Sequence, residues 1–297
     1  LEPLGADTAG SRYLDPDGSF PNHIPNPENE TAMQSILDAV QESKADLGII
    51  FDTDVDRAGA VLSDGTELNR NRIIAMMAAI LLREHPGTTI VTDSITSTGL
   101  AAFIRKHGGV HHRFKRGYRN VINESMRLNR EGHDSQLAME TSGHGALKEN
   151  YFLDDGAYLV TRLLIELARA KKEGYTLESL IADLAEPAES KEFRMNILVP
   201  DFKAYGQKII DELNVYAASQ PGWSVAPDNF EGVRVNLDKA HGDGWFLLRL
   251  SLHDPLIPLN IESDSVGGVR QIAAELAPFL RPFDQLDTSA LLAFAGC

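Results

Sequence analysis

The sequence predicts an α/β fold, and three observations lead to this prediction. Short apolar runs alternate with amphipathic stretches through the first two thirds of the chain, which is typical of strands covered by helices. From about Lys191 onward, strand-like segments follow one another with two helical stretches between or after them, which indicates a separate α+β domain. The 297 residues, 43% of them apolar and 24% charged, are enough for more than one hydrophobic core.

The first elements predicted are a helix and two strands. Four apolar residues at helical spacing define the buried face of this helix: Met33, Ile36, Leu37 and Val40. Thr31 stands where an N-cap residue is expected. The apolar runs 47–51 and 58–62 predict strands. A second unit is expected to begin near Glu67, with a helix from Ile73 that is buried on most of its circumference.

The second unit repeats the alternation of strands and helices. Strands are predicted at 88–94, 110–114 and 136–141, and helices at 99–109 and 117–132. A longer helix is expected to end at Gly174, because glycine is favoured just after the last helical turn. Five residues of this helix are expected on its buried face: Ala157, Val160, Leu164, Leu167 and Ala168. Ligands of such sheets bind beyond the carboxyl ends of the strands, so the loops after these strands are candidate sites.

The last third of the chain predicts an open sheet with helices on one side. Four strands are expected, over 192–199, 230–237, 244–251 and 255–263. Two helical stretches lie between or after them, at 202–218 and 266–280. This part is therefore expected to form a smaller α+β domain.

Composition narrows the class of partner. The chain has 28 basic and 43 acidic side chains and a formal net charge of −15, which argues against nucleic acid or an anionic membrane and favours a small ligand. The single cysteine, Cys297, is the last residue, so we expect no disulfide framework and a cytoplasmic location. No apolar run reaches the roughly 18 residues of a membrane span, and residues 1–10 lack the features of a signal peptide.

The stretch FDTDVDR is the most informative in the chain. Asp52, Asp54 and Asp56 leave the end of a predicted strand at alternate positions, and Arg57 follows at once. Three carboxylates this close repel one another, so a cation is expected to balance them. All-oxygen ligation suits Mg²⁺. The alternative is a solvated acidic turn with Arg57 as its counter-ion. An EF-hand is excluded, because Arg57 and Ser63 stand where that loop needs glycine and glutamate.

A second cluster, ETSGHG, follows the strand predicted at 136–141. Its Glu140, Ser142 and His144 can hydrogen-bond the vicinal hydroxyls of a sugar, because each such hydroxyl both donates and accepts. The alternative interpretation is a helix N-cap at Ser142 with an exposed His144.

Two further stretches carry positive charge. In RLSLHDP, Arg249 and Ser251 lie on one side of a predicted strand end, where a guanidinium fork and a hydroxyl can bind phosphate. The alternative here is a β-hairpin with one surface arginine. In FKRGYRN, three basic residues flank a glycine at a predicted junction of strand and helix: Lys115, Arg116 and Arg119.

These four stretches, in this order, resemble the motifs of the α-D-phosphohexomutases, the family of phosphoglucomutases, phosphomannomutases and phosphoglucosamine mutases. FDTDVDR is similar to the metal loop DGDGDR, ETSGHG to the sugar loop GExSGH, and RLSLHDP to the phosphate loop RxSxTEP. FPNHIPNPEN is similar to the segment that usually precedes the last βα unit of the metal-loop domain. The resemblance implies Mg²⁺ on Asp52, Asp54 and Asp56, with Arg57 beside the nucleophile. It also implies sugar contacts from Glu140 and Ser142 and phosphate contacts from Arg249 and Ser251.

The sequence also departs from the family pattern. Thr53 and Val55 replace glycines of the metal loop, and Met139 replaces the glycine before the sugar loop. Leu252, His253 and Asp254 replace residues of the phosphate loop. The catalytic serine of the family lies in an upstream domain, within a motif like TASHNP that has no match here. By this resemblance the chain is the C-terminal portion of such an enzyme, without the catalytic-serine domain.

The resemblance predicts three domains and a mechanism. Two mixed, mostly parallel α/β/α sandwich units are expected, over 1–66 (incomplete) and 67–177, followed by the α+β phosphate-binding domain over 190–297. The implied reaction interconverts hexose 1-phosphate and hexose 6-phosphate through a phosphoserine of the missing N-terminal domain. The general base stays open, and three residues are candidates to lie near the reacting phosphate: Lys115, Arg119 and His144.

Two other functions are compatible with the same residues. FDTDV also resembles the DxDxT motif of the haloacid dehalogenase phosphatases and phosphomutases, with Asp52 as nucleophile and Asp54 as acid and base. That family also requires a downstream lysine and an acidic pair, for which the candidates are Lys115 and the pair Asp154 and Asp155. The third hypothesis is a sugar-phosphate binding module without catalysis.

Overall fold

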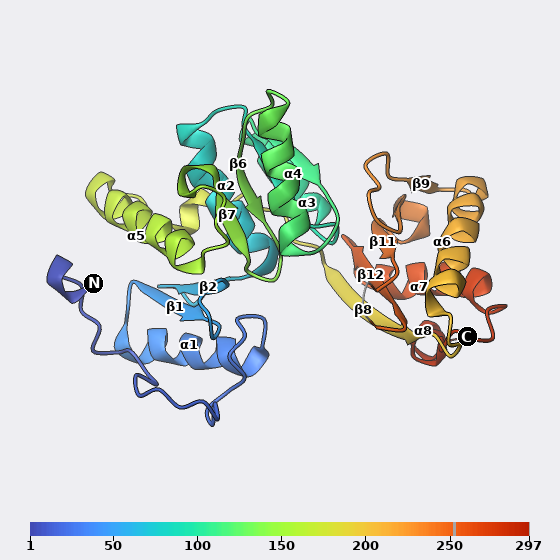
Figure 1. Ribbon diagram of the computed structural model, residues 1–297, viewed down its shortest axis with the longest axis horizontal. Coiled ribbons are helices and arrows are strands. Elements are labelled where there is room, and N and C mark those ends of the chain that lie inside the picture. Colours follow the sequence, from blue (N-terminus) through green and yellow to red (C-terminus); the bar gives the residue numbers. More distant parts are fainter. Residues whose placement is uncertain (252–253, 297) are drawn as a thin grey trace. The chain divides into compact units, whose positions relative to one another are not determined.

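The computed structural model describes residues 1–251 and 254–296, and it confirms the α/β class. The chain forms two compact units, Leu1–Ala185 and a second unit that begins at Glu186 (Figure 1). Leu252, His253 and Cys297 lie outside the described residues. None of the described helices is long and apolar enough to cross a bilayer.

The first unit contains two sheets, so its division into domains 1–66 and 67–177 stays a prediction. Its first sheet consists of β1 (Leu47–Phe51), β2 (Ala58–Leu62) and β3 (Glu67–Leu68). Both pairings are antiparallel, so the expectation of mostly parallel strands is wrong for this sheet. The loop 52–57 that joins β1 to β2 is the reason, because a parallel pair needs a crossover of a dozen residues or more.

Helix α1 (Glu30–Ser43) packs on this first sheet. Its residues Met33 and Val40 are buried against Val61 of β2, as the helical spacing predicted. The predicted cap at Thr31 is wrong. The N-cap is Asn29, whose side-chain oxygen accepts a hydrogen bond from the backbone N–H of Ala32 at 3.1 Å.

The second sheet is mixed and mostly parallel, as predicted. Its strands run in the order β5 (Val110–Arg113), β4 (Thr89–Thr92), β6 (Ser135–Met139) and β7 (Gly145–Leu147). β4 is parallel to β5 and β6, whereas β7 pairs antiparallel with β6. The carboxyl ends of the three parallel strands therefore share one edge of the sheet.

Four helices accompany this sheet: α2 (Arg70–Glu84), α3 (Thr98–Lys106), α4 (Tyr118–Arg130) and α5 (Gly156–Glu173). Ten consecutive residues of α2, Ile73–Leu82, are buried, as predicted. The predicted face of α5 is wrong in part, because Ala157 and Ala168 are exposed. Glu166 is buried instead and pairs with Arg83 of α2, so a charged residue occupies a position that hydrophobicity assigned to the surface.

The second unit is a five-stranded antiparallel sheet with helices. Its strands run in the order β8 (Glu189–Asn196), β12 (Leu256–Ser263), β11 (Gly244–Leu248), β10 (Val233–Leu237) and β9 (Trp223–Val225). Its helices are α6 (Phe202–Ser219), α7 (Gly268–Leu280) and α8 (Ser289–Ala295). Alternate strand residues such as Val235 and Phe246 share one core with Ile209 of α6 and Ile272 of α7. Short 3₁₀ helices in the two units are η1 (Glu2–Leu4), η2 (Lys148–Asn150), η3 (Glu178–Leu180) and η4 (Lys239–His241).

Candidate functional site

The loop between β1 and β2 gathers three carboxylates. One oxygen from each of Asp52, Asp54 and Asp56 lies within 4.8 Å of the others. Asp52 is buried, Asp54 is exposed, and Oδ1 of Asp56 is buried without a hydrogen-bond partner among the described residues. Burial and the neighbouring charge of Asp52 raise the pKa of Asp56 to about 6. Converging carboxylates with an unsatisfied buried oxygen fit a hard divalent cation such as Mg²⁺.

Arg57 compensates part of this charge. Its Nε donates to Oδ2 of Asp52 at 2.6 Å, and its backbone N–H donates to Oδ1 of the same carboxylate at 3.2 Å. Burial raises the pKa of Asp52, but the hydrogen bonds from Arg57 outweigh burial and hold that pKa below its usual value. Nη1 of Arg57 also donates to Oδ1 of Asn26 at 3.3 Å. The counter-ion contact of Arg57, which belonged to the alternative interpretation, is present at Asp52. Nε of Arg57 also lies 4.0 Å from Oδ1 of Asp56.

The loop between β6 and β7 carries the predicted sugar-binding residues. Glu140 is 4% exposed and accepts hydrogen bonds from the backbone N–H of Gly117 at 2.5 Å and from Oγ of Ser142 at 3.3 Å. Burial, followed by the nearby charge of Asp93, raises the pKa of Glu140 to about 7. Ser142 lies in a turn between two strands, so the alternative of a helix N-cap is wrong.

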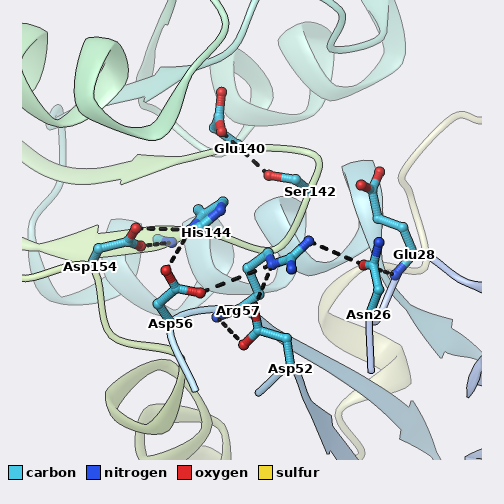
Figure 2. A network of polar contacts seen from close by, with 10 residues as sticks. Asn26, Glu28, Asp52, Asp56, Arg57, Glu140, Ser142, His144 and Asp154 are labelled. Atoms are coloured by element: carbon cyan, nitrogen blue, oxygen red, sulfur yellow. Dashed lines mark hydrogen bonds and ion pairs between the residues drawn. The ribbon is translucent and has the colours of Figure 1, made fainter. Parts of the chain in front are cut away.

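His144 connects this loop to the three aspartates. Its Nδ1 lies 2.8 Å from Oδ2 of Asp154 and 3.6 Å from Oδ2 of Asp56, as Figure 2 shows. The backbones of Arg57 and His144 also form an antiparallel bridge. Burial lowers the pKa of His144, but Asp154 and Asp56 outweigh burial and raise it above its usual value. The loops 52–57 and 140–144 therefore lie side by side within the first unit.

The basic residues predicted near this site lie beside aromatic rings. Tyr118 stacks on His144 with ring centroids 5.0 Å apart. Nε of Arg119 donates to the hydroxyl of Tyr118 at 3.0 Å, which links this exposed arginine indirectly to His144. Nζ of Lys115 lies 6.0 Å from the ring centroid of Phe114.

Arg249 and Ser251 belong to the second unit, directly after β11. The backbone N–H of Ser251 donates to the carbonyl of Leu256 at 3.0 Å, and its Oγ accepts from the N–H of Asp254 at 3.2 Å. The predicted hairpin is therefore present. Its arginine is not a surface residue, however, because the Arg249 side chain is 13% exposed and its Nε lies 3.3 Å from Oε1 of Glu231.

Five residues that contact the predicted ones had been given no role in this site: Asn26, Asp93, Tyr118, Asp154 and Glu231. Asp154 had been considered only with Asp155, as the acidic pair of the haloacid dehalogenase alternative. Asp93 follows β4, is fully buried and accepts a hydrogen bond from Oγ1 of Thr141 at 2.7 Å. Its position after a parallel strand is a signal that could have identified it. Asp154 stands next to Asp155, the N-cap of α5, and that pair of acids was the only local signal.

Comparisons with known proteins identify the family of this chain. The family model "Phosphoglucomutase/phosphomannomutase, alpha/beta/alpha domain II" matches residues 4–65, and the model of domain III matches residues 69–187. Phosphoglucomutase of Neisseria meningitidis serogroup A is 30% identical over 261 residues, which cover 88% of this chain and 53% of that protein. Phosphomannomutase/phosphoglucomutase of Pseudomonas putida is 32% identical over 274 residues, which cover 92% and 55%.

A solved structure supports the same relationship. The phosphoglucomutase/phosphomannomutase family protein of Burkholderia thailandensis superposes with a TM-score of 0.74 and 29% identity, covering 92% of this chain and 55% of that protein. The chain thus spans a little over half the length of the relatives it matches. Since two consecutive domain models of one family match most of its length, the chain belongs to the phosphoglucomutase/phosphomannomutase family, as the resemblance to the α-D-phosphohexomutases predicted.

Proposed function

We propose that this chain is the metal- and sugar-binding part of a phosphohexomutase, which interconverts hexose 1-phosphate and hexose 6-phosphate. The observation that carries the proposal is the contact of His144 with Asp56, because it unites a candidate metal loop and a candidate sugar loop in one site. The phosphoserine that exchanges the phosphoryl group belongs, in this proposal, to an N-terminal domain upstream of the chain. The single cysteine supports a cytoplasmic location for this reaction.

Mg²⁺ fits the three aspartates Asp52, Asp54 and Asp56. When bound there, it neutralises negative charge on the phosphoryl group in transfer. Arg57 adds a second positive charge beside the same carboxylates, held in place by Asp52 and Asn26. Catalysis of phosphoryl transfer is mostly positioning and electrostatics, so groups fixed in this way are suited to it.

We assign the binding of the sugar to Glu140 and Ser142, whose side chains are hydrogen-bonded to each other. A carboxylate accepts from sugar hydroxyls, and a serine hydroxyl both donates and accepts, so the pair can hold the sugar in two orientations. His144 lies beside them with Nδ1 directed to Asp154, and it can hold a proton near the reacting phosphate. Lys115 and Arg119 are exposed cations that follow β5, and we assign them to binding the negative charge of the ligand.

We assign to Arg249 and Ser251 the binding of the phosphate group that does not react. Oγ of Ser251 accepts a hydrogen bond from the backbone of Asp254, so its own proton can be donated to a phosphate oxygen. A guanidinium binds phosphate through two parallel hydrogen bonds.

The alternative aspartyl nucleophile at Asp52 has less support, because Arg57 engages both oxygens of that carboxylate.

The experiment uses the 297-residue chain with glucose 1-phosphate and mannose 1-phosphate. Calorimetric titration with Mg²⁺ present should show binding of at least one of them, and a coupled assay should show no turnover. The same chain preceded by the N-terminal domain should turn the substrate over. Absence of binding would contradict the proposal. Turnover by the 297 residues alone would contradict the phosphoserine assignment and favour Asp52 as nucleophile.

A further inference from the structure

Arg249 is paired with a carboxylate that comes from a different loop of the second unit. Its Nε lies 3.3 Å from Oε1 of Glu231, and the two side chains are only 13% and 16% exposed. Glu231 stands just before β10, and Arg249 follows β11. Because Val233 of β10 lies opposite Leu248 of β11, the contact joins the adjacent ends of these two strands. A pair this shielded is screened less by salt and water than one at the surface.

The backbone at Gly232 makes this contact possible. Its φ is +59°, a left-handed conformation that favours glycine. A Cβ atom at this position would lie 2.2 Å from the carbonyl oxygen of Leu248 and 2.8 Å from Cβ of Arg249. Only glycine lets the chain pass this close to β11, and this passage places the Glu231 carboxylate at the guanidinium.

Hydrogen bonds hold both sides of the pair. Oδ1 of Asn229 accepts from the backbone N–H of Arg234 at 2.9 Å, and the carbonyl of Arg234 accepts from the N–H of Ala226 at 2.9 Å. These bonds close the loop that carries the glutamate. On the other strand, the N–H of Arg249 donates to the carbonyl of Pro258 at 3.2 Å. The carboxylate and the guanidinium are therefore presented by two fixed backbone segments.

We propose that Glu231 is a positioning residue for Arg249, and that its ion pair at Nε holds the guanidinium in place for the phosphate of the ligand. This inference rests on the proposed function. The contact is an ion pair, because Nε of Arg249 makes no hydrogen bond among the described residues although it lies 3.3 Å from Oε1 of Glu231. The carboxylate therefore holds the guanidinium through charge. Holding the side chain before binding reduces the entropy that binding must offset.

A carboxylate near a phosphate has a second effect of opposite sign, because like charges repel. If positioning dominates, removing Glu231 weakens the binding of a sugar phosphate. If repulsion dominates, removing it strengthens binding. The sign of the change therefore decides between the two roles.

The test is calorimetric titration of the 297-residue chain with glucose 6-phosphate. Glu231→Ala should weaken binding about three- to ten-fold, which corresponds to the ordering of one long side chain. Glu231→Gln keeps an acceptor oxygen at the same reach and should weaken binding less. Circular dichroism melts verify that each variant is folded, and Glu231→Gln, which is isosteric, serves if Glu231→Ala does not fold. Unchanged or tighter binding by the folded variants would overturn the inference.

The same change is also made in the Arg249→Lys variant, to separate positioning of Arg249 from a general effect of Glu231 on the second unit. In Arg249→Lys the ammonium is a point charge on a flexible stem, with no planar fork for a carboxylate to orient, so adding Glu231→Ala should no longer weaken binding. Weakening by the same factor in both backgrounds would overturn the inference. Glu192→Gln is the matched control, because it removes a carboxylate from the same sheet that pairs with Arg194; it should leave the affinity unchanged. If the unchanged chain shows no saturable binding at all, the proposed function fails, and the inference fails with it.

Discussion

The backbone N–H of Gly156 donates a hydrogen bond to the carbonyl of Val55 at 3.0 Å, which ties the first turn of α5 to the loop of three aspartates. A Cβ atom on Gly156 would lie 2.9 Å from that carbonyl oxygen and 2.9 Å from the carbonyl carbon of Arg57. Val55 has a φ of +63°, which is uncommon for a β-branched residue. Val55 thus keeps a strained conformation at a position where the motif DGDGDR has glycine. The hydrogen bond from α5 holds that conformation in place.

Val55→Gly should therefore stabilise the first unit. The left-handed conformation costs a non-glycine residue about 1 to 2 kcal/mol, and this exceeds the entropy cost of glycine, about 0.5 to 1 kcal/mol. Val55 is 37% exposed, so the loss of its remaining burial offsets part of this gain. Urea unfolding of the variant should show a higher midpoint. Val215→Gly is the control, since that exposed valine lies in α6, where glycine destabilises a helix. Equal destabilisation by both changes would contradict the strain argument.

Asp54→Asn should weaken the binding of a divalent cation about ten-fold or more, because a neutral amide is a poorer ligand than a carboxylate. Asp54 is chosen because it is the exposed member of the three, so the change disturbs packing least. The measurement is titration of the 297-residue chain with Mn²⁺, followed by electron paramagnetic resonance. Asp46→Asn, at the other end of β1 and paired with Lys171, is the matched control and should bind Mn²⁺ as before. Identical affinities for the two variants would remove the metal assignment.

Glu140→Gln should change how stability depends on pH. Glu140 has a pKa of about 7 in the folded chain against an ordinary value of 4.5, so the folded state binds the proton more tightly than the unfolded state does. Stability is then highest below about pH 4.5 and falls as the pH rises to about 7. Each pKa unit corresponds to about 1.4 kcal/mol, so the loss above pH 7 is on the order of 3 kcal/mol. Glutamine has no proton to lose, and the variant should lack this decline.

The measurement is the free energy of unfolding in urea between pH 5 and pH 8. Glu173→Gln, an exposed carboxylate at the end of α5, is the control for the loss of one acidic group. If Glu140→Gln follows the same pH dependence as the unchanged chain, the buried carboxylate does not titrate in this range.

The ends of strands were the most predictable part of the site. Apolar runs located β1 and β6, and the polar residues that follow these two strands lie together in the structure. The contact of Arg57 with Asp52 was foreseen in the same way, because both belong to one short loop. Strands of three residues, β7 and β9, gave no periodic signal, and they were missed.

Contacts between loops that are distant in the sequence could not be predicted. Asn26 reaches Arg57, and Asp154 reaches His144, through pairings that depend on how the sheets fold. The pairing of Glu231 with Arg249 depends on the register of β10 against β11, which a single sequence does not specify. The burial of charged residues could not be predicted from the sequence either, because hydrophobic patterns assign a glutamate to the surface by default.

Arg249→Lys should weaken the binding of glucose 6-phosphate although the charge is kept, and Arg249→Ala should weaken it further. One ammonium cannot reproduce the two parallel hydrogen bonds of a guanidinium to phosphate. Loss of a charge-assisted hydrogen bond in a shielded place costs about 1.5 to 3 kcal/mol, which is about ten-fold to over one hundred-fold in affinity. The 13% exposure of Arg249 supports the upper part of this range.

The measurement for Arg249 is calorimetric titration of the 297-residue chain, repeated with the longer protein as kcat/KM for both phosphomonoesters. Arg194→Lys is the matched control, because Arg194 lies on β8 of the same sheet with a side chain that is 59% exposed and paired with Glu192. It makes the same chemical change on the surface and should leave affinity and kcat/KM unchanged. Equal effects of Arg194→Lys and Arg249→Lys would show that only the general charge of the unit matters. In that case the hairpin after β11 would not be a specific phosphate-binding site. The only role left to the Arg249 guanidinium would be its ion pair with Glu231.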